Sequence, residues 1–161
     1  KLSLKYKIYN MITIEDFKSK HPNKVRFIGL DLGSKRIGVS ICDERQSIAT
    51  PYKTINKTNT NNLIVELQKI IKENKIRGII VGNPINMDGS MGRSTQSVND
   101  IASNISKSID LPVILWDERL STVGAFNLSS QLDVNVSKRV KTIDQNAAAF
   151  ILQGAIDFLN N

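Results

Sequence analysis

The sequence contains very little of the residues that form disulfides, zinc sites or imidazole catalysts. Its 161 residues include one cysteine and one histidine. A single cysteine excludes an internal disulfide, and Cys42 continues the apolar run from Ile37 to Ile41, so we expect it to be a buried structural thiol. His21 lies outside every motif, and we expect it to be exposed. Candidate chemistry therefore has to be sought among other side chains.

Long apolar segments are also missing. No apolar run approaches the roughly 18 residues that a membrane-spanning helix needs, and the start of the chain has lysines but no apolar signal core. Together with the lack of disulfides, this leads us to expect a cytoplasmic protein without a membrane partner. The sequence has neither a Walker A loop nor a Gly-x-Gly-x-x-Gly motif, which argues against the common nucleotide-binding domains.

What the sequence does have is an ordinary apolar content and an excess of positive charge. With 40% hydrophobic and 23% charged residues, the chain is long enough for one domain with a real core. The formal net charge is +7, and without the three lysines of the first seven residues it is still +4. Such an excess favours a polyanionic partner.

Hydrophobic periodicity predicts a three-stranded meander followed by alternating helices and strands. Because Met11 is a candidate natural start, we interpret residues 1–24 as a lead-in, of which 1–10 need not be native, and 25–161 as one domain. A capping box at Thr142–Gln145 predicts the start of the final helix, after a polar, basic connection over 134–141. The predicted strands are 25–32, 36–43, 48–55, 76–81 and 112–116, and the predicted helices are 60–74, a segment around Val98–Ile109, one from Ser121 to about 132, and 143–159.

This order of elements predicts an α/β protein with a mixed five-stranded sheet and helices on both faces. It is the order of the ribonuclease H-like fold.

Four carboxylates occupy notable positions in this pattern. Asp31 lies inside the first predicted strand, Asp117 and Glu118 follow the fifth, and Asp144 opens the final helix. Strand ends that fan out side by side would bring these acids together. Carboxylates without a nearby histidine suggest a site for hard divalent cations. In a basic protein, such a site suggests an enzyme that works on phosphodiesters.

Each acid also has a structural alternative. Asp31 could cap the turn after its strand, although an unpaired carboxylate in an apolar run is costly. Neighbours on a strand point in opposite directions, so one of Asp117 and Glu118 is expected to face the site. The other would pair with Arg119 or cap the next helix, and sequence parity does not decide which. Asp144 would be favoured in a first helical turn by the helix dipole alone.

A long loop over Asn83–Arg93 leaves the fourth predicted strand. Loops at this position are where α/β folds bind ligands. Its glycines, its amides and Arg93 suit contacts with phosphate.

At these residues the sequence resembles the YqgF/RuvX family of bacterial pre-16S rRNA nucleases, also described as Holliday junction resolvase-like proteins. The resemblance covers nearly everything from Val25 to Leu159. Two departures lie outside the acids: Asn83 stands where the family usually has Leu, and Gly124-Ala125 where an acid is common. Four motifs carry the resemblance in order: Gly29-Leu30-Asp31-Leu32-Gly33 with Gly38; Val81-Gly82-x-Pro84 with Asn86-Met87-Asp88-Gly89-Ser90; Asp117-Glu118-Arg119-Leu120-Ser121-Thr122; and Ile143-Asp144-x-x-Ala147-Ala148 with Ile151-Leu152-Gln153.

The resemblance implies a ribonuclease H-like nuclease with Asp31, Glu118 and Asp144 as catalytic acids and Asp117 as the second member of the acidic pair. Asp31, Glu118 and Asp144 would hold one or two Mg²⁺ or Mn²⁺ ions, about 4 Å apart if there are two. One ion would activate a water and the other would stabilise the leaving 3′ oxygen. Basic residues would hold the nucleic-acid backbone; these are Lys35, Arg36, Arg93, Arg119, Lys138, Arg139 and Lys141.

The sequence leaves three functions open, and we take the first as the prediction. It is a metal-dependent endonuclease that processes the 5′ end of precursor 16S rRNA, with precursor rRNA or a pre-ribosomal particle as partner. The second is a Holliday junction resolvase, which should be a symmetric dimer; the sequence does not decide between monomer and homodimer. The third is a non-catalytic nucleic-acid-binding module, which the loss of a carboxylate would have indicated, but none is lost.

Overall fold

The structure is a computed structural model that describes residues 10–85, 88–120 and 136–161, with the backbone alone for Arg93, Leu120 and 136–145. No helix of this described part is long and apolar enough to cross a lipid bilayer. Its elements are α2 (Ile14–Lys20), β1 (Phe27–Leu32), β2 (Arg36–Cys42), β3 (Ala49–Asn56), α3 (Thr60–Asn74), β4 (Gly78–Asn83), α4 (Arg93–Ser108), β5 (Val113–Asp117), the short 3₁₀ helix η1 (Glu118–Leu120) and α6 (Val136–Asn160).

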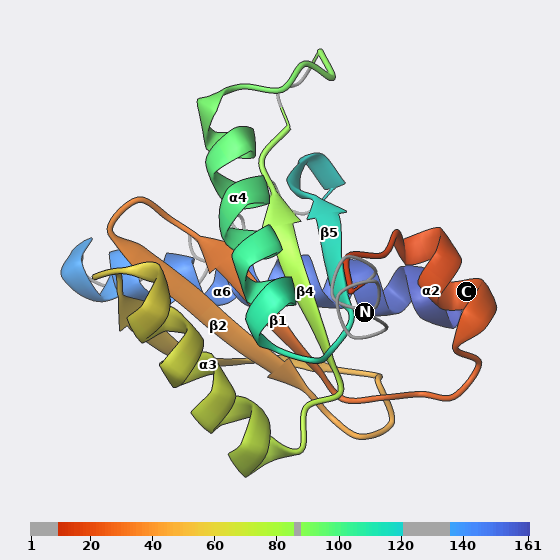
Figure 1. The fold of residues 1–161 in the computed structure, drawn as a ribbon. Coiled ribbons are helices and arrows are strands. Elements are labelled where there is room, and N and C mark those ends of the chain that lie inside the picture. Colours follow the sequence, from red (N-terminus) through yellow and green to blue (C-terminus); the bar gives the residue numbers. More distant parts are fainter. Residues whose placement is uncertain (1–9, 86–87, 121–135) are drawn as a thin grey trace.

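Five strands form one mixed sheet in the order β3-β2-β1-β4-β5. The first three strands are the predicted antiparallel meander, and β4 and β5 are added in parallel beside β1. Helices α3 and α4 cover one face of the sheet, and α6 lies along the other (Figure 1). The predicted mixed five-stranded sheet with helices on both faces is confirmed.

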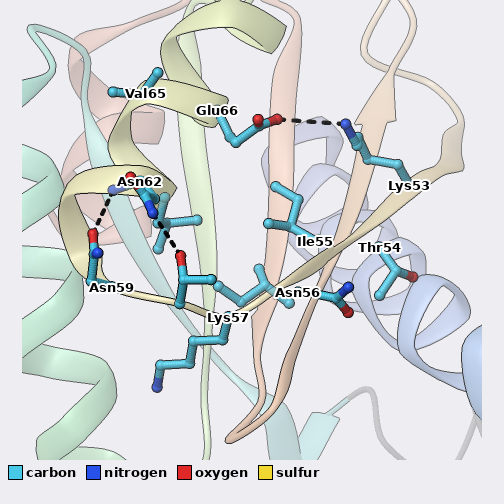
Figure 2. A pocket seen from close by; sticks show the side chains of 12 residues that line it. Lys53, Thr54, Ile55, Asn56, Lys57, Asn59, Asn62, Val65 and Glu66 are labelled. Carbon is cyan, nitrogen blue, oxygen red and sulfur yellow. Dashed lines mark hydrogen bonds and ion pairs between the residues drawn. The ribbon is translucent and has the colours of Figure 1, made fainter.

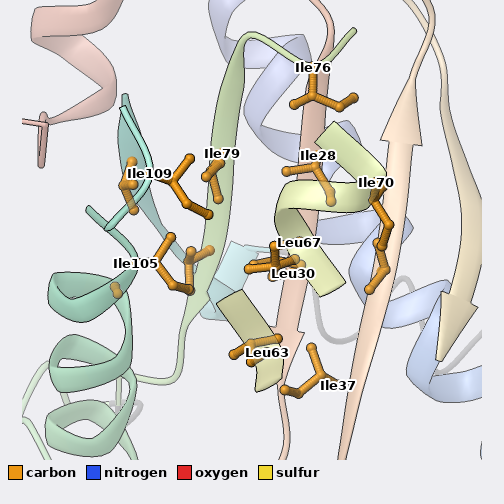
Figure 3. Packing of buried hydrophobic residues seen from close by; sticks show 14 of the residues in the cluster. Ile28, Leu30, Ile37, Leu63, Leu67, Ile70, Ile76, Ile79, Ile105 and Ile109 are labelled. Carbon is orange, nitrogen blue, oxygen red and sulfur yellow. The ribbon is translucent and has the colours of Figure 1, made fainter. Parts of the chain in front are cut away.

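The alternation of side chains along β1 explains how both faces are filled. Ile28 and Leu30 are fully buried and pack with the apolar stripes of α3 and α4 (Figure 3). Phe27 points to the other face, where it packs with α2 and with the apolar side of α6. Because successive residues of a strand alternate between faces, Gly29 and Asp31 share the α6 face with Phe27.

Helix α6 runs antiparallel to β1. Near the end of the helix, the Asn160 side chain donates to the Gln46 carbonyl at 2.7 Å, and Gln46 in turn accepts from the backbone of Val25, just before β1. Further back along the helix, the Ser40 hydroxyl donates to the Ala148 carbonyl at 2.8 Å. The amino-terminal half of α6 therefore extends toward the edge of the sheet at which β1 ends.

A glycine allows this helix to lie directly on the sheet. A Cβ on Gly29 would be 2.5 Å from the Ser40 hydroxyl, 2.7 Å from the Leu152 Cβ and 3.1 Å from the Ala148 carbonyl oxygen. Such distances are too short for any side chain, so the backbone of β1 and the helix approach each other only because residue 29 is glycine.

Several predicted boundaries are wrong, among them the start of β1, which is Phe27 rather than residue 25. The chain is already helical from Val136, so Thr142 lies inside α6 and 134–141 is not a polar connection up to that point. Helix propagation costs little next to a packed segment, and the lysines and arginine before Thr142 are good helix formers. Strand β4 is Gly78–Asn83 rather than 76–81; its last two residues, Gly82 and Asn83, are weak strand formers that extend the strand because they pair with β5. The helix predicted from Ser121 lies outside the described residues.

Candidate active site

The parallel strands bring three carboxyl ends to one edge of the sheet. Because β1, β4 and β5 run in the same direction, Asp31, Asn83 and Asp117 lie at the same edge. Asp31 is the fifth of the six residues of β1 and is half-buried on the α6 face. Its partner in the neighbouring strand β2 is Gly38.

Glu118 begins η1, directly after β5, and its side chain folds back over β4. A Cβ on Gly82 would lie 2.5 Å from the Ile151 Cδ1 and 3.1 Å from both Cγ and Oε1 of Glu118, so the glycine lets both side chains lie close over β4. Burial, then the charge of Asp31 and a side-chain hydrogen bond with it, raise the pKa of Glu118 to about 7. The carboxylates of Asp31, on β1, and of Glu118, directly after β5, therefore meet over Gly82 of the strand between them.

Asp117 is engaged elsewhere. Arg119 holds its carboxylate with a fork of hydrogen bonds, from Nε at 3.0 and 2.9 Å and from Nη2 at 2.6 Å, and the Arg119 backbone N–H adds another at 3.0 Å. These bonds hold the pKa of Asp117 below its usual range. Of the two alternatives that the sequence left open, the structure thus has Asp117 paired with Arg119 and Glu118 against Asp31. The catalytic roles themselves stay predictions.

Asp144 lies within α6, one helical turn before Ala148, rather than at the start of the helix. Its side chain is outside the described residues. Helical spacing places position 144 on the same stripe as Ala148 and Leu152, which face β1. Among the side chains that the structure does describe, no group of three or more Asp, Glu, His or Cys residues gathers in one place, so the described part of the site is the pair Asp31 and Glu118.

Comparison with known proteins identifies the family. The family model described as "RuvX: Holliday junction resolvase" matches residues 25–158. A protein of Pelagibacter ubique named "Putative pre-16S rRNA nuclease" is 90% identical over 151 residues, which are 94% of this chain and 100% of that protein. A protein of the same name from Rhodobacter capsulatus is 42% identical over 146 residues, or 91% of this chain and 92% of that protein.

The chain belongs to the RuvX family. This membership makes it a phosphodiester-cleaving hydrolase of the nuclease class. Solved structures show the fold. The yeast mitochondrial Holliday junction resolvase Ydc2 is similar with a TM-score of 0.51 at 10% identity, over 91% of this chain and 84% of that one. Thermus thermophilus RuvC in complex with a Holliday junction substrate has a TM-score of 0.50 at 10% identity, over 79% and 92%. The predicted ribonuclease H-like fold is confirmed.

The basic residues predicted to hold nucleic acid fall into three groups in this RuvX chain. Lys35, exposed in the turn after β1, and Arg36, the first residue of β2, lie at the edge where Asp31 lies. Arg119 is paired with Asp117, and its side chain is partly exposed. The others occupy the starts of helices, and their side chains lie outside the described residues: Arg93 in α4, and Lys138, Arg139 and Lys141 in α6.

A cavity of about 390 Å³ between β3 and α3 is not part of this site (Figure 2). Ile37 and Leu63 line it, and both belong to the core on the α3 face of the sheet. Asp31 and Glu118 lie on the α6 face. The Lys53 and Glu66 side chains at its rim pair with each other at 3.6 Å.

Sequence reasoning missed two residues that shape the site of this RuvX protein. Ser40 fixes α6 against the sheet through Ala148, and Gly82 makes room for Glu118. A signal for Ser40 was available, because a hydroxyl in the middle of a buried apolar strand needs a partner. Gly82 belongs to one of the four family motifs, but Glu118, which lies over it, comes from a distant segment, and the sequence does not show that contact.

Proposed function

We propose that the protein is a divalent-metal-dependent endonuclease that processes the 5′ end of precursor 16S rRNA in the cytoplasm. The observation that carries the proposal is the meeting of the Asp31 and Glu118 carboxylates across Gly82 at the carboxyl edge of the parallel strands. The names of the curated relatives support precursor rRNA as the substrate.

The two carboxylates fit a hard divalent cation. Burial raises the pKa of Glu118, and the nearby charge of Asp31 raises it further, to about 7, because two neighbouring carboxylates disfavour each other's charge. A cation between them would remove this repulsion, and carboxylate oxygens are ligands that Mg²⁺ and Mn²⁺ prefer. Asp144 is the third ligand in this proposal, because α6 carries it one turn beyond Ala148 toward the end of β1.

A bound Mg²⁺ or Mn²⁺ would supply an activated water and would neutralise the charge that develops on the phosphate. The chain's own residues would bind the cation and orient the substrate. Asp31 and Glu118 would hold the cation close to the backbone of the sheet, since Gly29 and Gly82 let the helix and the Glu118 side chain lie close to it. Lys35, exposed beyond Asp31, is placed to bind a phosphate of the incoming strand.

The proposal needs no histidine as a general base. His21 follows α2 and stacks on Phe17 with ring centroids 4.4 Å apart. It lines a hollow with Asn160, at the carboxyl end of α6. The carboxylate pair lies toward the other end of that helix. His21 is therefore not part of the site.

A second candidate is resolution of Holliday junctions, again with the same acids. The description of the family favours it, and so does the fold shared with resolvases. A resolvase that cuts paired strands needs two sites related by symmetry, so this candidate requires a homodimer, whereas rRNA trimming is compatible with a monomer.

One experiment separates the two. Purified protein is incubated with a precursor 16S rRNA fragment and with a four-way DNA junction, each with Mg²⁺, with Mn²⁺ and with EDTA, while light scattering gives the oligomeric state. We expect metal-dependent cleavage of the RNA at its 5′ side, and none with the Asp31→Asn variant. Symmetric cuts in the junction by a dimer, with the RNA left intact, would replace the first candidate with the second. Metal-independent cleavage would contradict both.

A further inference from the structure

Arg119 stands between Asp117 and the loop that leaves β4. Its Nε and one Nη donate to the Asp117 carboxylate, so the guanidinium is held in a fixed plane at the end of β5. Nη1 lies 3.8 Å from the place that a Cβ on Gly89 would occupy, so the guanidinium lies beside the loop.

The part of the loop beside Arg119 is a turn closed by Asp88. The Asp88 carboxylate accepts from the backbone N–H of Ser90 at 2.8 Å and from its hydroxyl at 2.6 Å, which closes the turn over Gly89. Asp88 and Arg119 are close enough for each to favour the charged form of the other. The positive charge of Arg119 therefore lies between the negative charges of Asp117, at the end of β5, and Asp88, in the turn.

This turn belongs to the edge that holds the carboxylate pair. The loop begins after Asn83, whose Cα partner in the sheet is Asp117, and it projects beyond the ends of β4 and β5 (Figure 1). The short helix η1 carries Glu118 and Arg119 side by side. Glu118 is directed to Asp31, and Arg119 to the turn. One short element thus connects the acids to the wall of the site.

We propose that Arg119 is a positioning residue: Asp117 orients it, and it holds the turn over Asp88–Ser90 beside the carboxylate pair, where the turn places the substrate strand. This inference rests on the proposed nuclease function. It gives Asp117 and Arg119 a joint role in place of the predicted roles of a catalytic acid and a direct contact with nucleic acid. A lysine cannot replace the arginine, since it has no planar fork with which to bind a carboxylate and the turn at once.

The test compares Arg119→Lys, Arg119→Gln and Asp117→Asn with a matched control, Arg77→Gln, which removes an exposed arginine just before β4, at the opposite end of that strand. For each protein, kcat and KM are measured for RNA cleavage, and hydrogen exchange is followed at the amides of 88–92. We expect each of the first three variants to raise KM about tenfold with kcat within about twofold. The same three should accelerate exchange in the turn, and the control should do neither.

A double variant, Asp117→Asn with Arg119→Gln, should be no worse than either single change, because both remove one connection. A fall in kcat with KM unchanged would make these residues part of the chemistry and overturn the proposal. Full rescue by lysine would mean a direct phosphate contact instead. If the wild-type protein cleaves no RNA, the proposed function fails, and the exchange rates alone decide whether Arg119 holds the turn: unchanged exchange would refute it.

Discussion

Replacing Glu118 with Gln should abolish cleavage and at the same time make the metal-free protein more stable at neutral and higher pH. In the native state the pKa of Glu118 is raised from 4.5 to about 7, by burial first and then by Asp31. Between these two values the native protein keeps a proton that the unfolded chain releases. Raising the pH through this window therefore favours unfolding, and stability is lost until the native carboxyl has ionised. Glutamine carries no such proton.

The size of the effect follows from the interval between the two pKa values. The full interval corresponds to about 3 kcal/mol, and because the side chain keeps some contact with water we expect about 2 kcal/mol. Wild-type protein in EDTA should lose this amount between about pH 4.5 and 8, and the variant should not. At pH 8 the variant should then be the more stable protein, by about 2 kcal/mol.

Urea unfolding followed by the fluorescence of Trp116, the single buried tryptophan, measures both proteins at a series of pH values. The matched control is Asp117→Asn, for which the sign is opposite. Arg119 lowers the pKa of Asp117, so its contribution is present above the unfolded pKa of 3.8 and is lost as the pH falls. That variant should be destabilised at pH 8. An identical pH dependence of stability in wild type and Glu118→Gln would refute the pairing of Glu118 with Asp31.

Three further outcomes are expected. Asp31→Asn should remove metal-dependent cleavage without loss of the fold, because it deletes a charged ligand and keeps the side-chain volume; cleavage at the wild-type rate in Mg²⁺ would exclude Asp31 as a ligand. Asn83→Leu should raise the free energy of unfolding by about 1 to 2 kcal/mol in urea, since the buried Asn83 Oδ1 has no hydrogen-bond partner among the residues that the structure describes; a less stable variant would show that the amide is satisfied. Neutralising the three charges near the start of α6 should weaken RNA binding and flatten its salt dependence, with little change in turnover at saturation; an unchanged salt slope would mean that they only solvate the helix. These charges are Lys138, Arg139 and Lys141.

The sheet was readable from the sequence because its signals are local. Apolar runs and turns delimit β1, β2 and β3, and the helical spacing of Leu63, Leu67 and Ile70 gives α3 with its observed bounds. The start of α6 was predicted too late: Val136, Val140 and Ile143 recur at helical spacing, but the capping pattern at Thr142, which also occurs inside a helix, indicated a start there. Boundaries of this kind depend on packing further along the chain.

For the site, the sequence showed which acids to examine but not which of Asp117 and Glu118 faces Asp31. Asp117 and Glu118 are adjacent, and the choice between them depends on where β5 ends and on the glycine beneath the next residue. The structure ends the strand at Asp117 and turns Glu118 over Gly82. Both facts come from contacts between distant segments. The partner of Asp117, by contrast, is two residues away, and pairing with Arg119 was one of the two alternatives considered.

The close approach at Gly29 has a consequence for how this protein can change over time. Most spacings in a protein interior are set by side chains and drift as those side chains are replaced. At Gly29 the spacing between β1 and α6 depends instead on the absence of a side chain beneath Ala148 and Leu152 and on the hydrogen bond from the Ser40 hydroxyl. Core substitutions on the α3 face of the sheet should leave this contact, and with it the place of residue 144 relative to Asp31, unchanged. A single added methyl group at residue 29 would alter it at once.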